Sequence, residues 1–206
     1  MKRLQDAHVY DEHWSSMLLD AASRFGFPGL VALRVSRWVN VPETTARREM
    51  AGMVWSGGRD QLRALRIAFQ GAMRVERRPR RILALARLRT WFEFELAQTG
   101  GQDQLVLEWA ESTGLPEPAY EVARRQVGDV LEAPAEAVSA IVTQICRSGE
   151  GRTTLFQAML ALAGKDQDEV ARERLMFALA WSLVVSSHGG RAPFVPAEEP
   201  ALNSWA

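Results

Sequence analysis

The stretch Val31-Ala-Leu-Arg-Val-Ser-Arg-Trp-Val-Asn-Val-Pro-Glu-Thr-Thr-Ala-Arg-Arg-Glu-Met-Ala-Gly-Met-Val54 decides the fold that this sequence predicts. Its apolar residues recur at spacings of three and four on both sides of a central Asn-Val-Pro, which predicts two short helices joined by a tight turn. We expect the small Ser36 to lie where the second helix crosses the first, and Asn40 to close the turn in a left-handed conformation. The residues expected to attach both helices to a supporting helix are Val35, Val39, Val41, Ala46 and Met50.

A helix pair of this kind is typical of DNA-reading proteins, in which the second helix enters the major groove. In this register the second helix presents polar side chains outward near its N-terminal end. Arginine pairs bidentately with guanine, and threonine contacts thymine methyl groups or phosphates. From these residues alone, an ordinary amphipathic helix pair with solvated arginines stays open as the alternative. The predicted DNA-contacting residues of the pair are Arg34, Arg37, Glu43, Thr44, Thr45, Arg47 and Arg48.

Charge is divided unevenly along the chain. Residues 1–90 contain 17 of the 25 basic and 8 of the 25 acidic residues, a net charge of +9, and residues 91–206 have a net charge of −9. A basic half indicates a polyanionic partner, because arginine and lysine displace the counterions condensed on phosphates. The sign changes near Arg89, inside or beside the predicted helix 82–96, so the two halves are expected to share a helix boundary rather than a flexible linker.

The densest basic cluster lies between two predicted helices. It contains Arg74, Arg77, Arg78, Arg80 and Arg81. Arg77 and Arg78 are predicted to contact phosphates beside the reading helix, and a solvated loop without a partner is the alternative.

Helical periodicity extends along nearly the whole chain, and glycines and prolines fall between the periodic segments. The sequence therefore predicts an all-α fold: a helix-turn-helix region over 1–58, a helical bundle domain over 59–190 and an extended or disordered tail over 191–206. The predicted helices cover 14–22, 30–39, 46–54, 62–73, 82–96, 105–109, 119–131, 135–146, 153–162 and 170–185.

The segment Val35–Met50, "VSRWVNVPETTARREM", resembles the helix-turn-helix of TetR-family transcriptional regulators. Leu18–Ala22, "LLDAA", matches the type of supporting helix that precedes it in that family, and Ala84–Leu96 loosely resembles a later helix. The part "ETTARREMAGMV" equally resembles the reading helix of winged-helix regulators, although no β-wing is predicted after it. The TetR resemblance implies a dimer with a small apolar effector, for which the candidate pocket residues are Trp91, Phe92, Trp109 and Phe156.

No arrangement of residues predicts catalysis, a metal site or a cofactor. The three histidines have no metal-ligand spacing, and phosphate-cradling and nucleophile motifs are missing from the sequence. Glu93 and Glu95 point about 200° apart on a helix, so they do not converge for acid–base work. The single cysteine, Cys146, is expected to be a buried small hydrophobe in a reducing compartment. Leu175–Val185 is too short and too interrupted to span a membrane, so we expect a soluble, cytoplasmic protein.

These observations predict a DNA-binding regulator that acts as a dimer, because reading a palindrome requires two-fold symmetry. The helix Val170–Val185 is so apolar that it is expected to form the dimer contact, with burial inside the monomer as the competing explanation. The alternative function is a helical subunit of a nucleoprotein complex, such as the small subunit of an RNA-guided CRISPR effector. Such a subunit would follow a nucleic-acid backbone without reading bases.

Overall fold

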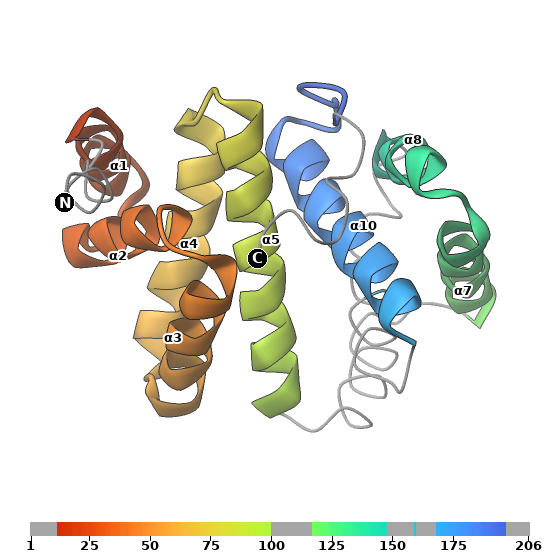
Figure 1. Cartoon of the computed structure of the whole chain (residues 1–206), viewed down its shortest axis with the longest axis horizontal. Coiled ribbons are helices and arrows are strands. Elements are labelled where there is room, and N and C mark those ends of the chain that lie inside the picture. The colour runs from red at the N-terminus through yellow and green to blue at the C-terminus, as the bar shows by residue number, and fades with distance from the viewer. Residues whose placement is uncertain (1–11, 100–116, 148–158, 160–167, 197–206) are drawn as a thin grey trace, which may run out of the picture.

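The computed structural model describes residues 12–99, 117–147, 159 and 168–196, and all regular structure in these ranges is helical (Figure 1). The all-α prediction is thereby confirmed. The predicted helices 105–109 and 153–162 lie outside the described residues, apart from Met159, which is helical and buried. The helices are α1 Glu12–Phe25, α2 Gly29–Val39, α3 Glu43–Ser56, α4 Arg59–Val75, α5 Pro79–Thr99, α7 Glu117–Glu132, α8 Ala135–Arg147 and α10 Glu169–Ser187.

The helix ends follow the residues that break helices. Gly26 has a φ of +75°, which other residues rarely adopt, and its N–H donates to the carbonyl of Ala22 where α1 ends. Gly189 and Gly190 also have positive φ and end α10. At the other end of α10, the Asp168 carboxylate accepts from the N–H of Ala171 at 2.7 Å, an ordinary N-cap.

The helices α1, α2 and α4 form the N-terminal part of the core. Trp38 of α2 stacks on Phe69 of α4 with ring centroids 6.2 Å apart, and Phe69 packs against Phe92 of α5 at 6.0 Å. A Cβ on Gly71 would lie 2.9 Å from the Phe25 ring, so only glycine allows this approach of α1 to α4. The aromatic residues thus connect α1, α2 and α4 to α5.

Helix α10 is the centre of the C-terminal part, between α5 and α8 (Figure 1). Every residue from Leu175 to Val185 is buried. The indole N–H of Trp181 donates to the hydroxyl of Thr143 at 2.8 Å, and Phe194 covers its ring at 5.3 Å. The expectation that this helix forms a dimer contact is therefore wrong, because its apolar surface is already covered within one chain.

Two smaller expectations are confirmed. Arg89 lies within α5, so the change of charge sign falls inside a continuous helix. Cys146 is fully buried. The part of the tail that is described has Phe194 packed on the protein itself. None of the described helices has the length and apolar character needed to cross a bilayer.

Candidate nucleic-acid interface

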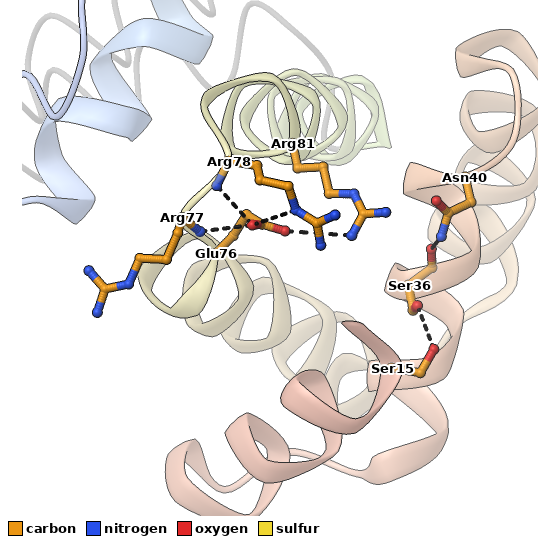
Figure 2. Close-up of polar contacts among 7 residues, drawn as sticks. All are labelled: Ser15, Ser36, Asn40, Glu76, Arg77, Arg78 and Arg81. Carbon is orange, nitrogen blue, oxygen red and sulfur yellow. Dashed lines mark hydrogen bonds and ion pairs between the residues drawn. The ribbon is translucent and has the colours of Figure 1, made fainter. Parts of the chain in front are cut away.

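The turn between α2 and α3 differs from the expected geometry. Asn40 has φ −104° and ψ 1°, and no described residue other than glycine has a positive φ. Its N–H donates to the carbonyl of Arg37 at 2.9 Å, and its side-chain amide donates to the carbonyl of Ser36 at 2.9 Å (Figure 2). Asn40 therefore caps α2 by hydrogen bonds, and the extended Pro42, with ψ 138°, leads into α3. The prediction of a left-handed asparagine is wrong.

The small Ser36 serves a different contact from the one predicted. Its buried hydroxyl lies 3.1 Å from that of Ser15 on α1, so the small side chain permits a hydrogen-bonded contact between α1 and α2 (Figure 2). The predicted attachment residues do face the core: three are fully buried and two are partly buried against it. They are Val35, Ala46 and Met50, and Val39 and Val41, respectively.

Two of the predicted DNA-contacting side chains on α3 point inward. The Glu43 carboxylate accepts from Arg87 Nε and from Trp91 Nε1 on α5, both at 3.1 Å. The Arg47 guanidinium lies over the Trp91 ring, 3.2 Å from its centroid. Burial lowers the pKa of Arg47, and the nearby glutamates, Glu43 first, oppose this change. The expectation that Glu43 and Arg47 face outward is wrong, because α5 supplies partners for both.

This inward placement agrees with the helical period of α3. The buried residues Ala46, Met50 and Val54 define the inner face. Glu43 and Arg47 lie three residues before Ala46 and three before Met50, which places them on the same side of a helix. The helical period therefore indicated that Glu43 and Arg47 face inward, but their charge favoured the prediction that they face solvent.

The opposite face of α3 is exposed. Thr44, Thr45 and Arg48 lie on it near the N-terminal end of the helix, and none of them has a side-chain hydrogen bond or ion pair within the described part of the chain. The three residues are one, three and four positions apart, which places their side chains next to one another on one side of a helix. The same face continues through Gly52 to Trp55. These predicted residues are thus free to meet a partner.

The two arginines of α2 are exposed but tied to α3. Arg37 forms an ion pair with Glu49, whose other carboxylate oxygen accepts from Trp38 Nε1 at 2.9 Å. Arg34 Nη1 lies 2.9 Å from the sulfur of Met53. Both side chains therefore hold α2 against α3, and Arg34 keeps donors free because a thioether is a weak acceptor.

One buried carboxylate binds some of the arginines of the basic cluster at the α4–α5 turn and leaves others exposed to solvent. Glu76, which is 3% exposed, accepts from the backbone N–H groups of Arg77 and Arg78 at 2.8 and 2.9 Å (Figure 2). The side chains of Arg78 and Arg81 also approach it, at 3.3 and 3.9 Å. Arg77 extends away from this carboxylate (Figure 2). The prediction of a phosphate contact is therefore kept for Arg77, whereas Arg78 already has an internal partner.

Further arginines of the basic half are neutralised by a carboxylate of the protein itself. Arg66 Nε and Nη2 donate to Glu93 at 2.7 and 2.6 Å, and this hydrogen-bonded carboxylate raises the pKa of Arg66. Arg89 lies 3.7 Å from the same carboxylate, and burial lowers its pKa. The net charge of the basic half thus overstates its free charge. Within the basic half, the exposed arginines that have no acidic partner among the described residues are Arg24, Arg34, Arg48, Arg59, Arg63, Arg74, Arg77 and Arg80.

The predicted effector residues are divided between the core and the undescribed part of the chain. Trp91 is buried beneath Arg47, and Phe92 is fully buried against Phe69. Trp109 and Phe156 lie outside the described residues. A hollow of about 510 Å³ lies elsewhere, where α8 and α10 end, and it is lined by Cys146, Arg147, Gly189, Gly190, Arg191 and Ala192. The effector pocket around Trp91 stays a prediction.

A comparison with known protein families, curated proteins and solved structures finds no match to this chain. Within the described residues, no group of three histidine, cysteine or acidic side chains is placed to hold a metal ion. The winged-helix alternative requires a β-hairpin after the reading helix. Here Gly57 and Gly58 lead directly from α3 into α4, so that position has no wing.

Proposed function

We propose that this chain is a helix-turn-helix transcriptional regulator of the TetR type, which binds duplex DNA through the outward face of α3. The observation that carries the proposal is the exposure of Thr44, Thr45 and Arg48 together, free of internal partners, in the first turns of the helix. Reading helices contact base edges with the side chains of their N-terminal part. Threonine and arginine are both side chains that make such contacts.

The side-chain contacts that fix α3 against α5 and α2 support this proposal. Glu43 and Arg47 attach its inner side to α5, and Arg37 and Glu49 attach it to α2. A reading helix must be rigid, because base recognition depends on side chains held within a fraction of an ångström. The inward residues therefore contribute by orienting the outward ones.

The free arginines supply the charge that such a protein needs. They lie on α1, α2, α3, α4, the α4–α5 turn and the first turn of α5. Phosphate contacts position a protein on the duplex, whereas contacts to base edges select the sequence. We assign the first role to Arg34 and Arg77 and the second to Arg48.

The proposed regulator acts in the cytoplasm as a dimer on a palindromic site, and its dimer contact lies outside the buried residues of α10. A small apolar effector is part of the TetR-type proposal. Leu19, which is 40% exposed on α1, and Leu30, which is 81% exposed on α2, are among the apolar side chains that remain available for a subunit contact. The nucleoprotein-subunit alternative is favoured by one observation, the distribution of free arginines over several helices instead of around one groove.

Replacing Thr45 and Arg48 together by alanine should weaken binding to DNA fragments that the wild type retains from a genomic library. Each good base contact is worth about 1–3 kcal/mol of discrimination, which corresponds to about 5- to 150-fold in affinity. Fluorescence anisotropy with the retained fragments measures this loss. Arg125→Ala is the matched control, because Arg125 is an exposed arginine on α7, in the acidic half.

The result also separates the two candidate functions. For the regulator, the double variant loses its preference for the retained fragments over random duplex. For a nucleoprotein subunit, it binds all sequences slightly less well and keeps the same ratio. Unchanged affinity for every fragment would remove the α3 face from both functions.

A further inference from the structure

The outward face of α3 ends in a tryptophan that the reading function does not use. Trp55 lies on the last turn of α3 and is 64% exposed. It is seven residues beyond Arg48, two helical turns along the same face. Between them, Gly52 leaves the surface open, since a Cβ there would meet no atom within 4 Å. The indole is thus accessible to a flat group that approaches along α3.

The residues that follow Trp55 add positive charge, and the glycine turn between α3 and α4 fixes where they lie. Gly57 joins α3 to α4, and a Cβ at this position would overlap the carbonyl oxygen of Met53, so only glycine makes the turn without a shift. Arg59 and Arg63 follow, exposed and four residues apart on the first turns of α4. The acidic side chain of this part is Asp60, also exposed. Arg48 precedes Trp55 in the sequence, and Arg59 and Arg63 follow it. Even with Asp60 included, the segment around the indole has a net positive charge.

An exposed indole with flanking arginines matches the chemistry of unpaired bases. Proteins that bind single strands combine aromatic side chains, on which bases stack, with cationic groups that follow the backbone. Paired bases do not offer their faces, because these are stacked inside the duplex. Trp55 also lies about 15 Å along the helix from Thr45, so it is well separated from the proposed base-reading side chains in the first turns of α3.

We propose that Trp55 is a stacking platform for an unpaired base of a bound nucleic acid, whose phosphates contact Arg48, Arg59 and Arg63. This inference rests on the proposed binding of nucleic acid at the α3 face, and it deepens that function by naming a second class of ligand. The protein then holds single-stranded nucleic acid at the C-terminal end of α3 and duplex at its N-terminal end. Arg48, which lies between the two ends, contributes to both.

The probe is an oligothymidine single strand, compared with a random-sequence duplex of the same length. Trp55→Ala should weaken binding of oligothymidine by about 5- to 150-fold, the range expected for one base–aromatic stack. Trp55→Phe should restore most of the affinity, because phenylalanine also stacks. Duplex affinity should be the same in the wild type and both variants. Oligothymidine should also quench the tryptophan fluorescence of the wild type more than that of Trp55→Phe.

The outcomes separate this inference from the proposed function. If Trp55→Ala binds oligothymidine as tightly as the wild type, the platform is overturned, whatever the Thr45/Arg48 double variant does on duplex. A loss on oligothymidine, with duplex binding unaffected by the double variant, keeps the platform and removes the regulator. If Trp55→Ala instead converts a dimer into a monomer in sedimentation velocity, the tryptophan is a subunit contact and the platform is overturned.

Discussion

Replacing Leu183 by glutamate is expected to destabilise the fold strongly and not to release folded subunits from a dimer. Leu183 is 8% exposed within one chain, near the C-terminal end of the buried stretch Leu175–Val185 of α10. The variant loses about 1.5–3 kcal/mol of apolar burial and also places a carboxylate, without a partner, where water is excluded. Domains of this size are typically stable by about 5–15 kcal/mol, so the change removes a large share. Thermal unfolding followed by circular dichroism measures it.

The matched control for this variant is Val170→Glu, on the first turn of the same helix. Its side chain is half exposed, and a carboxylate near a helix N-terminus is stabilised by the helix dipole. This control should unfold at the wild-type temperature. A Leu183→Glu protein with full helical circular dichroism and half the wild-type mass in sedimentation would contradict the placement of α10 in the monomer core.

Replacing Glu93 by glutamine is expected to have the second-largest effect. Its buried carboxylate is bound by two groups of Arg66, and Arg89, whose side chain is 15% exposed, lies beside it. Breaking a buried ion pair by removing one partner typically costs about 3–5 kcal/mol, because the other charge stays buried and uncompensated. Here Arg89 stays buried without this carboxylate, whereas the side chain of Arg66 is 51% exposed and is solvated, so we expect a loss at the lower end of that range. The urea midpoint should therefore fall clearly, with the slope of the transition unchanged.

Glu95→Gln is the control for this variant. Glu95 is two residues further along α5 and half-buried, and no hydrogen bond or ion pair joins it to another described side chain. Its urea midpoint should stay within error of the wild type. Equal midpoints for the two variants would mean that the Arg66–Glu93 pair does not hold α4 against α5.

The helices were predictable because their signals are local. Apolar residues three and four apart mark the buried faces, and Gly26, Pro134 and the Gly57-Gly58 pair fall where helices end. The position of α10 was not predictable in this way. A helix that is apolar on all sides is buried, but its composition does not tell whether its own chain or a second subunit covers it.

The candidate site was predictable only in part. A sequence segment shows how many arginines it contains, but the carboxylates that neutralise these arginines are distant in sequence. Arg66 and Glu93 are 27 residues apart, and Arg87 and Glu43 are 44 apart. Periodicity predicted the outward Thr44 correctly. It also placed Arg47 beside the inner face, but an arginine on the edge of a buried stripe can turn either way, and only the neighbouring Trp91 decides. The resemblance to TetR regulators carries no information on these pairs.

Selection of bound fragments from a random-sequence duplex library tests the central proposal, that the α3 face reads DNA, most directly. The account predicts that the wild type enriches a recurrent, two-fold-related motif. It also predicts that the Thr45/Arg48 double-alanine variant loses this motif, while Arg125→Ala retains it. If the protein binds more DNA as the salt concentration is lowered but enriches no sequence, the proposal is contradicted. Such binding requires only phosphate contacts and no base reading.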